Sequence, residues 1–225
     1  MAEPGYAANS VVNQIPQSIV FEEKKTYTIL KRGIDIFGAL FGLICLSWLF
    51  LIITILIKLE DPKGPVFFKQ IRVGKNGKEF YMYKFRSMVT DAEEILKDLL
   101  KYNEIEGAMF KIKNDPRITK IGKVLRKTSM DELPQLINVL KGNMSLVGPR
   151  PPLPREVAQY TNYDKQRLLV TPGCTGLWQV TGRNSVSFKK MVELDLIYIK
   201  NRSLIYDIRI ILKTIVIILK PNNAY

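Results

Sequence analysis

An uncharged, almost wholly apolar run from Ile36 to Ile57 constrains the fold of this chain most. Its 22 residues would form a helix about 33 Å long, against a hydrocarbon thickness of roughly 30 Å. Uncharged apolar runs of this length usually belong to membranes, so we expect residues 29–60 to form a membrane-embedded helix. A helix buried in a protein core is the alternative.

The flanks of this run favour a helix that enters the membrane and returns to the same side. Lys31 and Arg32 precede the run and Lys58 follows it, and positive residues favour the cytoplasmic side of a membrane. We expect Ser47 to break the helix by donating a hydrogen bond back to the carbonyl of Leu43. A single crossing of the bilayer stays open as the alternative.

Two glycines on the run, Gly38 and Gly42, are four residues apart and therefore lie on one helical face. Such a small-xxx-small pair would let another helix approach closely. Chance occurrence in an apolar helix is the other interpretation.

The charge of the chain points to an anionic partner. The formal net charge is +13, which is typical of proteins that meet nucleic acid, an acidic membrane surface or a phosphorylated substrate. The sequence contains no histidine, so imidazole cannot serve as an acid, a base or a metal ligand. The two cysteines, Cys45 and Cys174, predict neither a disulfide framework nor a thiolate metal site, and they fit a reducing, cytosolic setting.

The remaining chain predicts a flexible arm and a catalytic domain. Residues 1–28 lack apolar periodicity, and residues 61–225 contain the expected cytosolic domain. Asn76-Gly77, between β-rich runs at Pro65–Arg72 and Lys78–Phe85, is a strong hairpin signal. We expect helices over Thr90–Tyr102, from Asp131 to Gly142, over Arg155–Leu169 and over Leu204–Leu219, with a loop at residues 171–173.

The last of these helices carries charges among its apolar residues, which favours a helix in the membrane interface or one packed on the core. The fold class predicted from all these signals is a membrane-anchored, helix-rich α+β protein. It would have a re-entrant N-terminal membrane helix, a β-hairpin, and a small cytosolic catalytic domain with interfacial amphipathic helices.

Asp131 and Glu132 are adjacent carboxylates at the expected start of a helix. Their simplest role is capping, because Ser129 and Glu132 have the spacing of a capping box and Asp131 is itself a good N-cap residue. A chemical role is also coherent. The helix dipole would keep both carboxylates ionised, an ionised carboxylate can attack phosphorus, and carboxylate with phosphate oxygens suits Mg²⁺. Both interpretations stay open on the residues alone.

Basic side chains that could hold phosphate are spread along the domain. They are Arg72, Lys84, Arg86, Arg117, Arg126, Arg150 and Arg183. Arg150 stands out because Pro149 and Pro151 stiffen its loop, and a guanidinium can bind phosphate oxygens in a bidentate manner. Neither a P-loop nor a dinucleotide-binding glycine motif occurs, so a bound nucleotide would be held in another way.

A series of ordered motifs carries a family resemblance. They are Lys31-Arg32-x-x-Asp35, Gly64-Pro65-Val66-Phe67-Phe68-Lys69-Gln70, Tyr83-Lys84-Phe85-Arg86-Ser87-Met88, Asp115-Pro116-Arg117-Ile118-Thr119, Asp131-Glu132-Leu133-Pro134-Gln135-Leu136, Met144-Ser145-Leu146-Val147-Gly148-Pro149-Arg150-Pro151, Pro172-Gly173-Cys174-Thr175-Gly176-Leu177-Trp178-Gln179-Val180 and Gly182-Arg183. Over about residues 30 to 220, the chain resembles the monotopic phosphoglycosyl transferases, which are bacterial sugar transferases that act on polyprenyl phosphate.

The resemblance implies transfer of a sugar 1-phosphate from a UDP-sugar to undecaprenyl phosphate, with release of UMP. Such transfer initiates the synthesis of exopolysaccharide, capsule, O-antigen or glycoprotein glycans at the cytoplasmic face of the bacterial inner membrane. By the resemblance, Asp131 is the nucleophile that carries the phosphosugar, Glu132 is its metal or acid/base partner, and Mg²⁺ is the cofactor. Phosphate binding is assigned to Arg126, Arg150, Arg183, Lys84 and Arg86.

The sequence departs from the family at the expected bend, where Ser47-Trp48 replaces the family's Ser-Pro pair. The long members also have an N-terminal multi-span region, and we expect this chain to be the compact catalytic form. Two other readings stay open: a membrane-tethered protein that binds nucleic acid or another acidic partner, and a scaffold that crosses the bilayer once. As a transferase the chain would need no nucleic acid. The sequence does not reveal the sugar, and it leaves a homodimer open.

Overall fold

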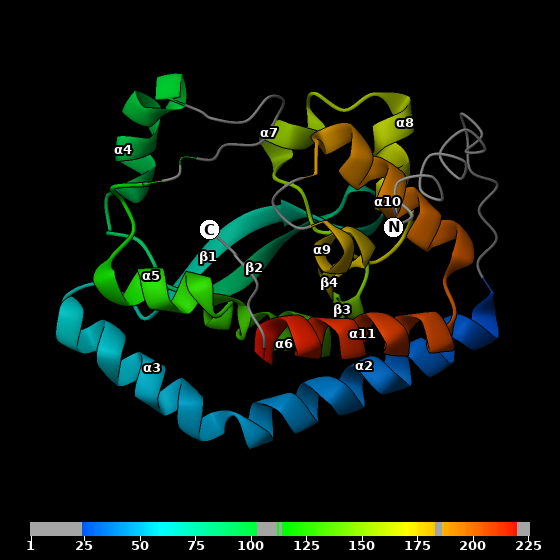
Figure 1. Cartoon of the computed structure of the whole chain (residues 1–225), viewed down its shortest axis with the longest axis horizontal. Coiled ribbons are helices and arrows are strands. Elements are labelled where there is room, and N and C mark those ends of the chain that lie inside the picture. The colour runs from blue at the N-terminus through cyan, green and yellow to red at the C-terminus, as the bar shows by residue number, and fades with distance from the viewer. Residues whose placement is uncertain (1–23, 103–111, 113, 183–185, 220–225) are drawn as a thin grey trace, which may run out of the picture.

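The computed structural model describes residues 24–102, 112, 114–182 and 186–219. These residues form a helix-rich α+β fold with two small, two-stranded sheets, which confirms that part of the prediction. Figure 1 shows two long helices, α2 (Lys25–Cys45) and α3 (Ser47–Glu60), that meet in a wide V along one side of the molecule. Helix α2 includes residues 25–28, which the sequence had placed in the arm, and residues 1–23 lie outside the described ranges.

The bend between α2 and α3 is 60° and falls at Leu46, whose φ of −99° and ψ of 7° are not helical. The amides of Leu49 and Phe50 both donate to the Leu46 carbonyl, at 2.9 and 3.0 Å, and so start the new helix. Ser47 is the first residue of α3, and within the described ranges its hydroxyl makes no bond to Leu43. The expected place of the break was therefore one residue off, and the expected cause was wrong.

No single helix of the described chain has the length and apolar character to cross a membrane. The α2–α3 pair meets these criteria only when its two arms are taken together. The side chains on its outer side are apolar and exposed, including Phe37 (73 %), Ile44 (71 %) and Leu59 (74 %). Exposure of this kind rules out the alternative of a helix enclosed in a protein core.

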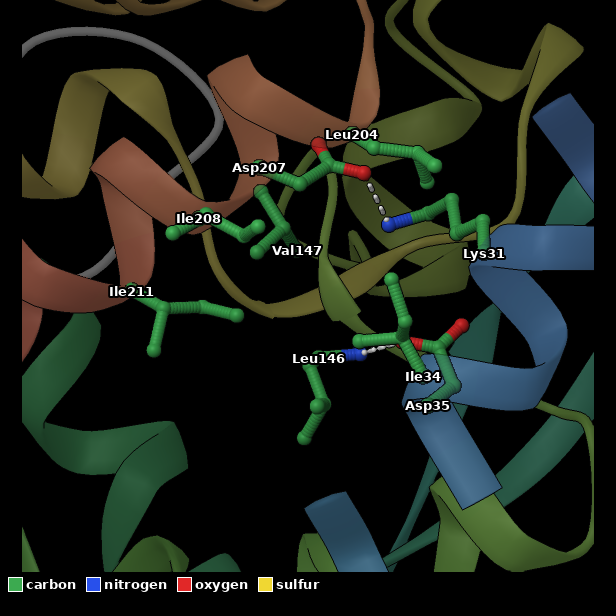
Figure 2. Close-up of a pocket in the computed structure, with 9 residues that line it drawn as sticks. All are labelled: Lys31, Ile34, Asp35, Leu146, Val147, Leu204, Asp207, Ile208 and Ile211. Carbon is green, nitrogen blue, oxygen red and sulfur yellow. Dashed lines mark hydrogen bonds and ion pairs between the residues drawn. The ribbon is translucent and has the colours of Figure 1, made fainter. Parts of the chain in front are cut away.

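The inner side of α2 is held to the domain by the Lys31-Arg32-x-x-Asp35 motif. The Arg32 guanidinium donates to the carbonyls of Val139 and Leu140 at the end of α6 (Gln135–Leu140), at 2.6 and 2.8 Å. Asp35 accepts a hydrogen bond of 2.9 Å from the Leu146 amide. As Figure 2 shows, Lys31 reaches across to a carboxylate of α11 (Leu204–Leu219) and forms a 2.8 Å ion pair with Asp207.

The glycine pair on α2 lets the domain approach closely. A Cβ atom on Gly38 would lie 2.7 Å from a methyl carbon of Leu146, and one on Gly42 would lie 3.0 Å from a methyl carbon of Leu136. The surface that packs against the glycines is therefore formed by α6 and by strand β3 (Ser145–Val147) of the domain. One of the two approaching elements, α6, is a helix, as expected for such a glycine pair.

The predicted hairpin is confirmed. Strands β1 (Phe67–Val73) and β2 (Glu79–Phe85) pair in an antiparallel manner, and the turn between them contains Asn76 and Gly77 at φ 56° and 78°. Helix α6 packs against β2, where the amide of the buried Asn138 accepts from the Tyr83 amide and donates to the Tyr81 carbonyl, at 2.9 and 2.7 Å. These bonds fix the position of β2 relative to α6.

A second sheet was not predicted. Strand β3 (Ser145–Val147) pairs in parallel with β4 (Gly173–Thr175), part of which the sequence had placed in a loop. A Cβ atom on Gly173 would lie only 2.0 Å from the Gly148 nitrogen, so the approach requires glycine at this position. The Gly173 amide also donates to the Pro149 carbonyl at 2.9 Å. The loop that carries Arg150 is thus tied to β4.

Several further helices complete the described fold. They are α4 (Ala92–Leu99), α5 (Lys120–Lys127), α7 (Pro154–Val157), α8 (Asn162–Lys165), α9 (Leu177–Thr181) and α10 (Phe188–Asn201). The single helix expected over Arg155–Leu169 is wrong, because Thr161 and Asp164 form a capping box that starts α8 as a separate helix. Helix α11 has its predicted bounds and packs one face on the core through Ile210, while Ile205 on the other face is 65 % exposed.

Candidate active site

Asp131 and Glu132 lie on a short 3₁₀ turn, η3 (Met130–Glu132), between α5 and α6. The predicted helix start at Asp131 is wrong, because α6 begins at Gln135. Ser129 makes no capping hydrogen bond, so the capping-box interpretation is also wrong. Ser129 instead adopts a left-handed conformation with φ 58° and ψ 18°, which is uncommon for a residue other than glycine and often marks a functional site.

Lys84 of β2 binds both carboxylates of the turn. Its Nζ lies 2.6 Å from Oε1 of Glu132 and 3.9 Å from Oδ2 of Asp131. The Asp131 side chain is only 8 % exposed, whereas that of Glu132 is 29 % exposed. Lys84 therefore holds Glu132 at the opening of the site and leaves Asp131 deeper inside it.

The surroundings move the two carboxylate pKa values in opposite directions. Burial raises the pKa of Asp131, and this effect outweighs the opposing effect of Lys84. Burial also disfavours the charged form of Glu132, but Lys84 and Arg150 outweigh it and lower the pKa of Glu132 to about 2. We had expected a helix dipole to keep both carboxylates ionised, but the pair lies on η3, before the first residue of α6, and burial and neighbouring cations account for the two shifts. Carboxylates separated in this way can take different chemical roles.

Two of the predicted phosphate-binding arginines lie near the pair. Arg126, in the last turn of α5, lowers the pKa of Asp131, and Arg150, on the loop after β3, lowers that of Glu132. In the described part of the chain, neither guanidinium is engaged in an ion pair. Both can therefore donate hydrogen bonds to phosphate oxygens.

Arg86 does not belong to this group of cations. Its guanidinium donates to the Asp61 carboxylate at 2.8 Å and to the Asp61 carbonyl at 3.1 Å. It thus stabilises the segment that follows α3, and its assignment to phosphate binding is not supported. Arg183, which was also assigned to phosphate binding, lies outside the described residues.

Arg72 was one of the basic candidates in the sequence but was not among the residues assigned to phosphate binding, and the structure places it at the site. It is 6 % exposed, it lines the same cavity as Lys84, Glu132 and Arg150, and burial and the charge of Arg150 lower its pKa to about 10. The hairpin register would have revealed it. Arg72 lies opposite Phe80, and the alternation of side chains then places Arg72 and Lys84 on the same face.

The carboxylate pair fits a magnesium ion whose coordination a bound substrate would complete. No group of three or more acidic or sulfur ligands gathers within the described residues. Mg²⁺, however, is commonly bound by one or two carboxylates together with substrate phosphates. Glu132 presents a partly exposed carboxylate at the opening, next to cations that suit phosphate. The donor set therefore agrees with an ion shared between the pair and a bound diphosphate.

Comparison with known proteins gives a family and several close relatives. Residues 26–221 match the family model described as bacterial sugar transferase. The chain is 51 % identical over 202 residues to the galactosyl transferase CpsE of Streptococcus agalactiae, and this match covers 89 % of the chain and 44 % of the relative. It is 47 % identical over 206 residues to the undecaprenyl-phosphate galactose phosphotransferase of Salmonella typhimurium, covering 90 % of the chain and 43 % of that protein.

A shorter relative matches over most of its length. The exopolysaccharide production protein ExoY of Rhizobium meliloti is 42 % identical over 199 residues, which cover 87 % of the chain and 88 % of ExoY. By contrast, the chain spans less than half the length of the two longer relatives. The family match includes α2, the carboxylate turn and the Arg150 loop together. The chain therefore belongs to the bacterial sugar transferase family.

Proposed function

We propose that this chain transfers a sugar 1-phosphate from a UDP-sugar to undecaprenyl phosphate and releases UMP. The observation that carries the proposal is the buried Asp131 carboxylate, set beside Glu132 and Lys84 and close to the unengaged guanidinium groups of Arg126 and Arg150. Phosphate-rich substrates need such a concentration of cations, and phosphoryl transfer needs a placed nucleophile. The name of the Salmonella relative supports undecaprenyl phosphate as the acceptor.

In the first step, a carboxylate oxygen of Asp131 attacks the phosphorus that bears the sugar. A new bond joins this oxygen to phosphorus, the bond from phosphorus to the UMP oxygen breaks, and UMP leaves with that electron pair. Asp131 suits the role because its raised pKa marks a more basic, and hence more nucleophilic, carboxylate than Glu132. Arg126 and Arg150 offset the negative charge that gathers around the phosphorus.

In the second step, a phosphate oxygen of the lipid attacks the same phosphorus. The bond to Asp131 breaks, the carboxylate is regenerated, and undecaprenyl-diphosphate-sugar is the product. Glu132 stays ionised throughout, and Lys84 keeps it in place through the 2.6 Å contact. Bound Mg²⁺, held by Asp131, Glu132 and phosphate oxygens, would neutralise charge on the diphosphate.

The α2–α3 pair is proposed to sit in the cytoplasmic face of a bacterial inner membrane as a re-entrant element. The bend of 60° and the exposed apolar outer side support this placement, as does the apolar outer face of α11. The lipid phosphate would then reach the site at the headgroup level, while the sugar nucleotide arrives from the cytosol. The cationic surface of the domain favours anionic lipid, by roughly 1 kcal/mol for each Lys or Arg near the membrane.

The proposal is tested by incubating the purified protein in detergent with Mg²⁺, undecaprenyl phosphate and a panel of UDP-sugars, and by measuring UMP. UDP-galactose is the first donor to try, because the names of two relatives specify galactose and galactosyl transfer. We expect UMP and a lipid-linked diphosphate sugar in equal amounts. If no donor in the panel gives UMP, the proposed function is wrong.

A further inference from the structure

The cavity beside the carboxylate pair contains hydrogen-bonding groups that the proposed mechanism does not use. It is lined by Arg72 and Gln135 as well as by Lys84, Glu132 and Arg150, and Gln179 of α9 closes another side. Two buried atoms on these side chains have no hydrogen-bond partner in the described structure: Nε of Arg72 and Oε1 of Gln179. Buried polar atoms without partners are rare and costly, so two of them on side chains that line one cavity need a physical reason.

The two unpartnered atoms have opposite hydrogen-bonding character. Nε of Arg72 can only donate, and Oε1 of Gln179 can only accept. The nitrogen of the Gln179 amide donates a long hydrogen bond of 3.4 Å to the Cys174 carbonyl. Gln135, which is 3 % exposed, adds an amide with both a donor and an acceptor. A phosphate oxygen would satisfy the donors only, whereas a hydroxyl group can satisfy donors and acceptors together.

The cavity is narrow and opens to solvent. Its free space is about 10 Å³, close to the space that one water-sized group needs. A whole sugar ring cannot enter it, but one hydroxyl of a ring lying across its opening can.

Of the two hydroxyl-bearing parts of a UDP-sugar, the sugar is the one within reach. Lys84 and Glu132 both line the cavity. Lys84 lies 3.9 Å from the carboxylate of the reacting Asp131, and Glu132 is the next residue in the chain. In the proposed reaction, the sugar is bonded to the phosphorus that Asp131 attacks. The uridine lies beyond a second phosphate, which departs with UMP.

We infer that Arg72, Gln135 and Gln179 form a subsite that recognises one hydroxyl group of the transferred sugar and so selects the donor. This inference rests on the proposed function and adds to it the residues that determine sugar specificity. The hydroxyl would be recognised by the amide groups of Gln135 and Gln179 and by the guanidinium of Arg72, all of which line the cavity. Arg72 would then be a specificity residue in addition to its place among the cations.

The test combines two substitutions with donors that lack one hydroxyl at a time. Gln179→Met and Gln135→Met preserve side-chain length while removing the amide, and Gln159→Met on the exposed surface is the matched control. The donors are UDP-galactose and a set of UDP-galactose analogues, each without one of the sugar hydroxyls. For each combination, kcat/KM is measured from UMP release.

We expect the wild type to use one deoxy donor roughly 10- to 100-fold less well than UDP-galactose, since that donor would leave buried groups unpaired. In Gln179→Met this difference should shrink to about threefold or less, and in the Gln159→Met control it should persist. A weaker reduction of the difference is expected for Gln135→Met. If galactose is not the sugar used, the same series is made from the donor that gives UMP.

Two results would overturn the inference while the proposed function survives. One is a wild type that releases UMP yet uses every deoxy donor equally well, which would mean that the cavity holds only water. The other is a wild type that discriminates among the donors, with the same discrimination retained in Gln179→Met. The first result is obtained with the wild type alone. Poor folding of a variant therefore cannot prevent the inference from being disproved.

Discussion

Asp131 and Asp195 are both buried carboxylates beside a cation, but their surroundings differ. The difference distinguishes a carboxylate placed for reaction from one that stabilises the fold. Burial raises the pKa of both groups, that of Asp195 to about 6. Asp195, on α10, pairs with Arg167, and these side chains are 1 % and 3 % exposed. Arg167 also donates to the Tyr160 hydroxyl at 2.8 Å and to the Arg150 carbonyl at 3.3 Å, so both of its terminal nitrogens are engaged by protein groups.

The carboxylate at Asp131 adjoins a site with an opening. Its neighbour Glu132 is partly exposed, Lys84 is shared between the two carboxylates, and Arg126 lacks an ion-pair partner in the described chain. Burial and a perturbed pKa therefore do not mark a reactive carboxylate by themselves. Asp131 differs from Asp195 because its site has an opening for substrate and contains cations that are free to bind that substrate.

The largest expected effect comes from Asp131→Asn. Removal of the proposed nucleophile should lower the rate of UMP release by on the order of 10⁴-fold while the thermal unfolding midpoint stays close to that of the wild type. Asp98→Asn, on the exposed surface of α4, is the matched control and should keep full activity. Wild-type kinetics in Asp131→Asn would remove the distinction drawn between the two carboxylates.

Asp195→Ala should have the opposite profile. It leaves the buried Arg167 guanidinium without its counter-charge, which typically costs about 3–5 kcal/mol of stability. Denaturant unfolding in detergent measures this loss, and the activity of the fraction that remains folded should stay within a few-fold of the wild type. A stable Asp195→Ala protein without activity would place Asp195 in the chemistry instead.

Arg150→Ala tests whether the unengaged cations bind substrate. Loss of charge-assisted hydrogen bonds to phosphate should reduce kcat/KM by roughly 10- to 100-fold. Arg155→Ala removes an exposed arginine close by in the sequence, and its kcat/KM should be unchanged. Equal losses in the two variants would show that general positive charge, rather than the placed guanidinium, accounts for the effect.

Arg167→Lys should give the smallest effect in this set. Lysine keeps the charge beside Asp195 but cannot reach Tyr160 and Asp195 together as the guanidinium does, so we expect a loss of about 1–2 kcal/mol in the free energy of unfolding. UMP release by the folded protein should remain near the wild-type value. A loss as large as that of Asp195→Ala would mean that geometry, more than charge, stabilises the pair.

Local sequence signals predicted the parts of the fold that depend on local physics. Asn76-Gly77 predicted the hairpin because its turn requires positive φ angles, and the apolar run of Leu204–Leu219, with its interspersed charges, predicted α11 with the correct bounds. The carboxylate pair was found as a candidate from its chemistry. The local structure of the pair was not predicted. Ser129 separates α5 from the turn by adopting a left-handed conformation, and a serine residue gives no sequence signal for that conformation.

The failures concern contacts between distant residues. The β3–β4 pair joins two three-residue strands about 25 residues apart, too short for a periodic pattern. Arg86 appeared as available as Lys84, but Asp61 reaches it from the segment after α3. The sequence offered Arg72 as one of several basic candidates, and the hairpin register, which assigns faces once the pairing is known, selects it for the site. Each of these outcomes depends on tertiary structure that a residue pattern does not contain.

The most direct test of the account is to look for the phosphosugar on the protein itself. Purified protein is mixed with Mg²⁺ and UDP-galactose, or the donor found to be active, without lipid phosphate, then quenched and examined by intact-protein and peptide mass spectrometry. The account predicts one added sugar phosphate on the peptide that contains Asp131, its absence in Asp131→Asn, and its disappearance on addition of undecaprenyl phosphate. A wild type that turns over but carries no adduct, or carries it on another residue, would contradict the account.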